Sequence, residues 1–263
     1  MTSRKSFDCV IPVYNEQRRL PANIETLHRF LSEELSNYDW RIVIADNAST
    51  DATQELGRGF AEKLDGVSYF RLDRKGRGLA LKATWMRSNA DFVSYMDVDL
   101  STNLKAVGEM MDLFERGWEV VLGSRLIAGA NITRCRHREI ISRGWNFLVG
   151  AVFNTRFSDA QCGFKGLSRG AKEILVPQLE DPKWFFDTEL LVLAEKQGFR
   201  MHEIAVEWVE DTDSTVQLVS TIIDDLAAMA RLRGQLMRPE LLRRPAATPS
   251  GEGFGDTNAG ERR

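Results

Sequence analysis

The sequence predicts an α/β protein with a mainly parallel β-sheet, helices on both of its faces, and a helical C-terminal region. Three observations favour this fold class. Short apolar runs alternate with helix-period segments across the first half of the chain, which is typical of βαβ units. Polar clusters follow the carboxyl ends of the first five apolar runs, where open α/β sheets bind ligands. The 263 residues, 43% of them apolar, suffice for one large core.

The predicted strands of the first half are short apolar runs, and the helices between them repeat apolar residues at helical spacing. Ser49 or Thr50 is a predicted helix cap, and the pair Ser101 and Thr102 is another. The predicted strands are 7–13, 40–45, 67–72, 92–96 and 120–122, and the helices run over about 20–35, 50–64, 79–87 and 104–114.

The second half breaks this alternation. An apolar helix is predicted around Trp145, followed by a turn at 159–165 that leads into a short strand. A further helix, a strand at 201–208 and a long helix at 216–237 complete the domain. On that long helix the predicted apolar face consists of Val219, Ile222, Leu226, Met229 and Leu236. Residues 239–263 are rich in Pro, Gly and charged residues, which predicts a disordered tail.

The composition excludes several classes of protein. The net charge of −3 argues against a general nucleic-acid binder. The three cysteines lack paired spacing, which argues against a disulfide scaffold and favours a reducing cytoplasm. No apolar run reaches the ~18 residues of a membrane span, and no signal-peptide pattern opens the chain. We therefore expect a cytoplasmic protein that is soluble or peripheral on a membrane.

Asp97 and Asp99 directly follow the predicted strand 92–96. Two carboxylates at the end of a buried strand are unfavourable unless a cation compensates them. Mg²⁺ and Mn²⁺ prefer carboxylate, phosphate and water oxygens, and such a metal stabilises the charge on a departing diphosphate. The motif therefore predicts a metal site for a phosphorylated ligand. The alternative is a capped helix start with two solvated acids.

Three motifs, in this order, resemble family 2 inverting glycosyltransferases of the GT-A fold: Val10–Glu16, Asp46–Asp51 and Asp97–Asp99. Asp159–Lys165 and Phe186–Leu190 resemble the polyprenyl-phosphate (dolichyl-phosphate) sugar synthases, especially their glucosyltransferase-like branch. The resemblance covers about residues 7–235. It implies metal-dependent, inverting transfer of a hexose or N-acetylhexosamine from a nucleotide sugar, a UDP-sugar rather than GDP-mannose, to polyprenyl phosphate. It also implies one domain over 1–238, with a nucleotide-sugar half at 7–125 and an acceptor half at 126–238.

The first two loops are expected to hold the nucleotide of the donor. Pro12, Tyr14 and Glu16 would shape the first wall, and Asp46 would accept a hydrogen bond from a base N–H. Relatives often carry two adjacent acids here, whereas this chain has Asn47 in second place. That difference removes one charge and leaves the base contact open.

The charged groups around the diphosphate come from two other loops. By the resemblance, Asp99 is the first choice as direct ligand of Mg²⁺ or Mn²⁺. Asp97, also a candidate ligand, would hold the ribose or a metal-bound water. Lys75 and Arg77 lie in a basic glycine turn after the third strand, together with Arg74. They are predicted to neutralise the diphosphate; a solvated loop is the alternative.

The acceptor half is expected to bind a lipid phosphate. A phosphate oxygen is already an anion, so it needs positioning more than a general base, and arginines bind phosphate in a bidentate manner. By the resemblance, Arg125, Arg138 and Ser142 bind this phosphate, the last two being one helical turn apart. Asp159 is a catalytic candidate that would orient the acceptor or the sugar hydroxyls. Gln161 and Glu189 are further candidates, and a structural cap is the alternative for all three.

One departure from the family leaves other functions open. Relatives carry Ser-Lys after the last strand, where this chain has Ser214 and Thr215. Lys75 or Arg77 would have to replace the missing cation. One alternative is therefore a non-catalytic regulator that binds nucleotide sugars. Another is a soluble family 2 glycosyltransferase that acts on a saccharide or small-molecule hydroxyl, with Asp159 as general base.

The lipid acceptor implies contact with the cytoplasmic face of a membrane. The apolar helix around Trp145 and the final helix, which has arginines near its end, are predicted to lie in the membrane interface. The alternative is that Trp145, Leu148 and Val152 pack in the core. The final helix would then pack on a partner, either a second copy of the chain or a membrane protein.

Overall fold

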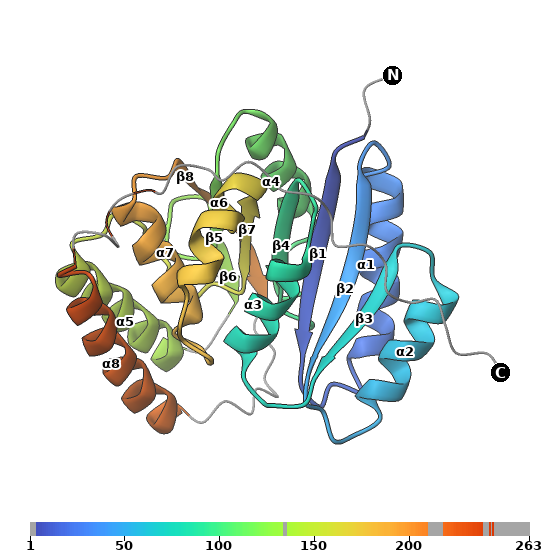
Figure 1. Ribbon diagram of the computed structural model, residues 1–263, viewed down its shortest axis with the longest axis horizontal. Coiled ribbons are helices and arrows are strands. Elements are labelled where there is room, and N and C mark those ends of the chain that lie inside the picture. Colours follow the sequence, from blue (N-terminus) through green and yellow to red (C-terminus); the bar gives the residue numbers. More distant parts are fainter. Residues whose placement is uncertain (1–3, 134–135, 210–217, 239–241, 243, 245–263) are drawn as a thin grey trace.

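A computed structural model of the protein describes residues 4–133, 136–209, 218–238, 242 and 244. At its centre lies a seven-stranded sheet of order β3-β2-β1-β4-β7-β5-β8 (Figure 1). Among the strands of this sheet β7 runs antiparallel to its neighbours β4 and β5, and the other pairs are parallel. The strands are β1 (Ser6–Val13), β2 (Asp39–Asn47), β3 (Val67–Leu72), β4 (Phe92–Met96), β5 (Val120–Ser124), β7 (Phe164–Ser168) and β8 (Met201–Ala205).

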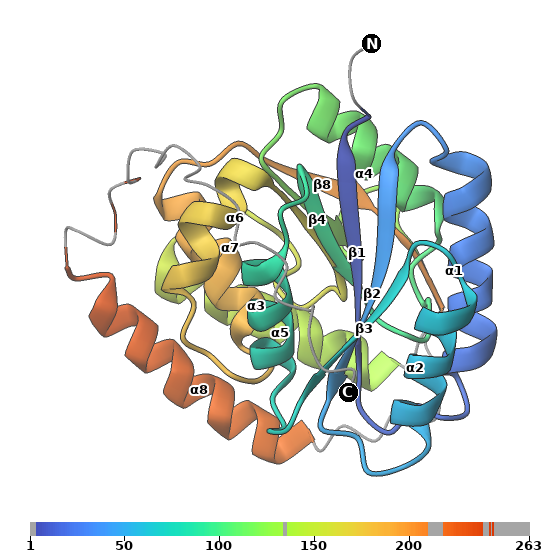
Figure 2. The ribbon, with the colours of Figure 1, turned by 45° about the vertical axis from the view of Figure 1, so that its right-hand side comes forward.

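Helices cover both faces of the sheet and bury a separate core on each (Figure 2). Successive residues of a strand point to opposite faces, so Cys9 and Ile11 join one core while Val10 joins the other. The first core lies under α1 (Leu20–Glu34), α2 (Thr53–Lys63) and α4 (Lys105–Glu115). The second lies under α3 (Arg77–Arg87), α5 (Arg136–Phe153), α6 (Arg169–Leu175), α7 (Phe186–Lys196) and α8 (Leu218–Gln235). The predicted α/β class is confirmed.

The carboxyl ends of β1, β2, β4 and β5 meet at one edge of the sheet because these strands are parallel. The antiparallel β7 begins at this edge, with Phe164 opposite Met96. The loop before β7 therefore lies beside the residues that follow β4, and Asp97 N donates to Gly163 O at 3.2 Å. This insertion joins the two halves of the chain at the candidate site.

The predicted helix caps are wrong at two positions. Helix α2 begins at Thr53, and the Ser49 hydroxyl accepts a hydrogen bond from Asn15 N instead of capping the helix. Helix α4 begins at Lys105, while Thr102 forms an isolated bridge with Trp208. Ser49 thus connects the segments that follow β1 and β2, and the Thr102 backbone pairs with a distant strand residue, which a local pattern does not reveal.

The end of the chain differs from its predicted pattern in two places. The predicted strand 201–208 divides into β8 and β9 (Glu207–Val209), and β9 pairs in parallel with β6 (Asn131–Thr133) in a second sheet. Among the α8 side chains that the structure describes, Asp225, Ala228, Met229 and Leu232 are buried, whereas Ile222 and Leu226 are exposed. The predicted tail 239–263 lies outside the described residues, apart from positions 242 and 244.

Candidate functional site

Asp46, at the end of β2, is fully buried and both of its carboxylate oxygens are engaged within the protein. Its Oδ1 accepts from Ser49 N at 2.8 Å, and its Oδ2 accepts from the Tyr69 hydroxyl at 2.5 Å and from Arg71 at 3.0 Å. A carboxylate with these partners has little remaining capacity to accept a bond from a base N–H. In this structure Asp46 organises the loop after β2.

The next residue, Asn47, ties this loop to the glycine turn after β3. Gly76 N donates to Asn47 Oδ1 at 2.5 Å. In the same turn, the exposed Lys75 places its Nζ 3.7 Å from the centre of the Tyr14 ring, within cation–π range. The residues after β1, β2 and β3 thus form one continuous wall. Glu16 lies at its rim, where its backbone N donates to Thr53 Oγ1 at 2.8 Å.

Arg77, the first residue of α3, bridges two carboxylates at the centre of the edge. Its guanidinium donates to Asp97 Oδ1 at 2.9 Å and to Asp187 Oδ2 at 2.8 Å. It lies 4.8 Å from the centre of the Tyr95 ring and 4.9 Å from that of Trp184. Burial lowers the pKa of Arg77, but the nearby carboxylates outweigh this and raise it well above its ordinary value. The arginine is therefore a fixed cation that orients Asp97, and its contact with a diphosphate stays a prediction.

Asp97 retains solvent access, with 32% of its side chain exposed. A Cβ at position 163 would overlap its Oδ2, so only glycine leaves room for this carboxylate. Burial raises the pKa of Asp97, and Arg77 opposes that shift. Asp99 is half-buried, and its Oδ1 accepts from Ser101 N at 3.0 Å.

These two carboxylates fit a divalent metal that shares its coordination with a ligand. In the described part of the chain, no group of three or more His, Cys, Asp or Glu could hold a metal without other ligands. Mg²⁺ is commonly bound through one or two carboxylates, with substrate phosphates and waters completing the octahedron. Asp97 and Asp99 match that donor set.

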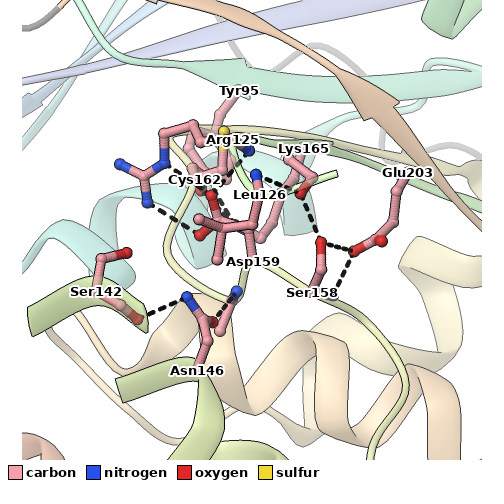
Figure 3. Close-up of polar contacts among 12 residues, drawn as sticks. Tyr95, Arg125, Leu126, Ser142, Asn146, Ser158, Asp159, Cys162, Lys165 and Glu203 are labelled. Carbon is pink, nitrogen blue, oxygen red and sulfur yellow. Dashed lines mark hydrogen bonds and ion pairs between the residues drawn. The ribbon is translucent and has the colours of Figure 1, made fainter. Parts of the chain in front are cut away.

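Arg125 and Asp159 form a buried, bidentate ion pair at the end of β5 (Figure 3). The Nε–Oδ2 distance is 2.7 Å, the Nη2–Oδ1 distance is 2.9 Å, and Arg125 N adds a third bond at 3.1 Å. Burial raises the pKa of Asp159, but the guanidinium and its hydrogen bonds outweigh this and hold the pKa below its ordinary value. The guanidinium also lies 5.0 Å from the centre of the Trp208 ring.

Helix α5 brings Ser142 to the guanidinium side of this pair, as Figure 3 shows. Asn146 fixes the helix there: its Oδ1 accepts from Ala160 N at 2.8 Å, and its Nδ2 donates to Ser142 O at 3.0 Å. The Ser142 hydroxyl is buried and has no hydrogen-bond partner among the described residues. Arg138 belongs to α5, but its side chain lies outside the described part, as does the whole segment that contains Thr215.

A model of glycosyl transferase family 2 matches residues 8–175. The chain belongs to glycosyl transferase family 2. The predicted family is thereby confirmed, and this match covers the wall formed after β1, β2 and β3, the Asp97–Asp99 motif and the Arg125–Asp159 pair.

Curated relatives of this family 2 chain include glycosyltransferase AglD of Haloferax volcanii, which is 34% identical over 242 residues. That match covers 89% of this chain but 38% of the relative, so this chain spans less than half of the length of AglD. Dolichyl-phosphate beta-glucosyltransferase of Dictyostelium discoideum is 29% identical over 237 residues, covering 85% of this chain and 72% of the relative. The Saccharomyces cerevisiae enzyme of that name is 28% identical over 230 residues, covering 80% and 68%.

Among solved structures, glucosyl-3-phosphoglycerate synthase from Mycobacterium tuberculosis, in complex with UDP, superposes with a TM-score of 0.66. The alignment covers 88% of this chain and 80% of that chain at 18% identity. At this identity the likeness establishes the shared fold and leaves the substrate open. The predicted GT-A architecture of the family 2 chain is confirmed.

Several residues of the site have no separate signal in the sequence of this family 2 member. In the sequence, Asp187 stands out only as part of the motif Phe186–Leu190, yet in the structure it accepts from Arg77 and, through Oδ1 at 2.5 Å, from the Tyr95 hydroxyl. Lys165 is fully buried and donates to Cys162 O at 2.6 Å. A tyrosine in an apolar strand and a lysine at a turn are ordinary residues until the fold brings them together.

Gln161 and Glu189 serve internal packing in the structure. Glu189 Oε2 accepts from the backbone of Glu180 and Asp181 at 2.9 and 2.7 Å, which is the structural cap that the sequence left open. Gln161 Nε2 donates to Asp225 Oδ2 of α8 at 3.1 Å. The loop that carries Asp159 is thus attached to the last described helix.

The Asp225→Asn variant is expected to be more stable than the wild type at pH 8 and nearly equal to it at pH 4. Burial, reinforced by the Asp181 charge, raises the pKa of Asp225 to about 7. The folded state therefore holds a proton that the unfolded chain releases above its pKa of about 3.9. Wild-type stability accordingly falls as the pH rises from about 4 to 7. Asparagine keeps the acceptor for Gln161 without the charge, so we expect a gain of roughly 1 kcal/mol at pH 8.

Urea unfolding at pH 4 and pH 8 measures this difference. The exposed neighbour Asp224, which pairs with Lys183 at 2.7 Å, provides the matched Asp224→Asn control. An equal effect of Asp225→Asn at both pH values would contradict the prediction, because it would exclude ionisation as the cause.

Proposed function

We propose that the chain catalyses metal-dependent, inverting transfer of a hexose or N-acetylhexosamine from a UDP-sugar to polyprenyl phosphate. The product is a polyprenyl-phosphate sugar. The supporting observation is the contact between the two halves of the site. Gly163 O accepts from Asp97 N and the glycine leaves room for the Asp97 carboxylate, and the same short loop carries Asp159, which holds Arg125. Groups suited to a metal-bound diphosphate and groups suited to a phosphate acceptor therefore converge on one loop. The relatives named dolichyl-phosphate beta-glucosyltransferases support the same acceptor class.

The state of Asp159 favours a phosphate acceptor over a hydroxyl acceptor. A hydroxyl needs a general base with a pKa near the working pH. Asp159 is fully buried, both of its oxygens bind Arg125, and its pKa is held below the ordinary value. A phosphate oxygen is already anionic and requires no base. We therefore assign Asp159 to the positioning of Arg125.

In this proposal each half of the site has one task. Asp97 and Asp99 would hold Mg²⁺ or Mn²⁺, with Arg77 keeping Asp97 in place. When bound, the metal supplies Lewis acidity to the leaving diphosphate. Arg125 and the unpartnered Ser142 hydroxyl would bind the acceptor phosphate, with Arg138 as the further predicted ligand. Fixing that phosphate in line with the anomeric carbon provides the entropic advantage of a bound nucleophile.

Extraction of transferred sugar into organic solvent tests this function directly. The chain is incubated with polyprenyl phosphate, Mg²⁺ and UDP-sugars labelled in the sugar. Label in the organic phase that depends on both the metal and the lipid is the expected result. Label that passes instead to a water-soluble saccharide would support the hydroxyl acceptor. Donor binding without any turnover would support the non-catalytic alternative.

We also propose that the chain works at the membrane surface, on its cytoplasmic face. None of the helices in the described part of the chain combines the length and apolarity that crossing a bilayer requires. Trp145 is buried in the core, which agrees with the alternative drawn from the sequence. The opposite side of α5 is exposed, however, with Ile140 at 71% and Phe147 at 78% exposure. Exposed apolar side chains beside Arg143 suit the interface of an anionic bilayer.

The Phe147→Glu variant is expected to bind lipid vesicles at least about tenfold more weakly than the wild type. Burying a phenylalanine side chain contributes about 1.5–3 kcal/mol, and glutamate adds repulsion from anionic lipids. Co-sedimentation with phosphatidylserine-containing vesicles measures the change. Met86→Glu on α3, where Met86 is 53% exposed, is the control for an added charge elsewhere. Equal binding by the two variants would argue against α5 as the docking surface.

A further inference from the structure

The loop after β2 presents a hydrogen-bond donor where the sequence leads one to expect an acceptor. Asp46, the predicted acceptor for a base N–H, is fully buried and accepts hydrogen bonds from Ser49, Tyr69 and Arg71. The neighbouring Asn47 is only 5% exposed. Asn47, rather than Asp46, is therefore the polar side chain at the end of β2 that is placed to contact a base.

The orientation of the Asn47 amide is determined by its partner. Gly76 N–H is a donor, so the atom 2.5 Å from it must be the amide oxygen. The NH₂ group consequently points away from Gly76. It makes no hydrogen bond to the described residues, and it does not belong to the buried, unpartnered polar atoms of that part of the chain. An amide that is nine-tenths buried thus directs a free donor to the surface of the wall.

The surroundings of this donor fit a flat, uncharged heterocycle. Asn47 lies at the end of β2 between the ends of β1 and β3, opposite Leu72. The Tyr14 ring, covered by Lys75, forms the neighbouring part of the wall. Aromatic rings stack on nucleobases, and a single donor beside a stacked base distinguishes a carbonyl edge from an amino edge.

We propose that Asn47 is a specificity-determining residue that selects a uracil base by donating to its C4 carbonyl. The inference rests on the proposed function, since it assumes a nucleotide donor at this wall. Cytosine carries an amino group at the same position, so it would place two donors against each other. A site built to bind one polar group rejects an analogue of opposite polarity because both groups lose their water without gaining a partner.

The Asn47→Asp variant isolates this role. An aspartate oxygen still accepts from Gly76 N, so the loop keeps its anchor, while the outward group changes from donor to acceptor. Titration of the full-length chain with UDP and with CDP, in the presence of Mg²⁺, measures the preference between the two nucleotides. We expect the wild type to favour UDP, and the ratio of the two dissociation constants to shift toward CDP by about tenfold or more in Asn47→Asp.

Asn47→Ala is the companion variant, because it removes the donor and also the acceptor for Gly76. It is expected to weaken the binding of both UDP and CDP, because the loop loses its anchor to Gly76. The inference would be overturned if the ratio of the UDP and CDP dissociation constants in Asn47→Asp stayed within twofold of the wild-type ratio. It would also be overturned if the wild type bound CDP more tightly than UDP. If the wild type transferred sugar from UDP-sugars and only the ratio failed to shift, the proposed function would stand without this inference. If the wild type bound neither nucleotide, both would fail.

Discussion

Replacement of Asp159 by leucine is expected to destabilise the protein by about 3–5 kcal/mol, the cost of leaving a buried charge without its partner. Arg125 has only 10% of its side chain exposed, and all three of its described hydrogen bonds go to Asp159. A loss of this size is a large part of the total stability of a typical domain. Urea unfolding of Asp159→Leu against wild type measures it.

The double variant Arg125→Met/Asp159→Leu separates stability from function. Replacing both members of a buried ion pair by apolar residues of similar size is often nearly neutral, so most of the lost stability should return. Transfer activity should not return, because Arg125, the proposed ligand of the acceptor phosphate, is gone. A double variant as unstable as the single one would show that the charge pair itself is not the cause.

The Arg125–Asp159 pair also makes the stability of the fold depend on pH. Because Arg125 holds the pKa of Asp159 below its ordinary value, the pair stabilises the fold fully above the unfolded pKa of about 3.9. That contribution is lost as the pH falls through the lower, folded-state pKa. The double variant should therefore lose less stability than the wild type below about pH 4.

Replacement of Asp99 by asparagine is expected to lower transfer by a factor of about 10³ or more while leaving the fold intact. Loss of a metal that stabilises the leaving diphosphate removes several kcal/mol of transition-state stabilisation. Asparagine still accepts from Ser101 N, and Asp99 is half-buried at the surface of the site. The melting temperature without ligand should therefore equal that of the wild type.

Two measurements test the role of Asp99. Activity is assayed over a range of Mg²⁺ and Mn²⁺ concentrations, and the thermal shift produced by UDP is compared with and without metal. The exposed Asp112 of α4 provides the control Asp112→Asn. An Asp99→Asn chain whose UDP-induced shift still increased fully with metal would falsify the assignment.

Much of the fold could be predicted because its signals are local. The five apolar runs of the first half became β1 to β5, and the helix-period segments between them became α1 to α4, within a few residues. Burial on both faces of a parallel sheet gives continuous apolar strands, and burial on one face of a helix gives a 3.6-residue period. The exposed Phe147 and the buried Asp225 could not be predicted, since periodicity marks a face without saying which partner covers it.

The sequence by itself determined that acids and glycines follow the strands of a parallel sheet, and hence that Asp97 and Asp99 lie at the edge formed by the carboxyl ends of the strands. Only the tertiary structure decided how these charges are paired. Arg77, a predicted diphosphate ligand, bridges Asp97 and Asp187 in the structure, and Asp159, a candidate base, pairs with Arg125. The physical reason is that a buried charge is costly unless it is paired, and its partner is the opposite charge that the fold places closest to it. Here the antiparallel β7 sets that proximity by bringing distant segments to one edge.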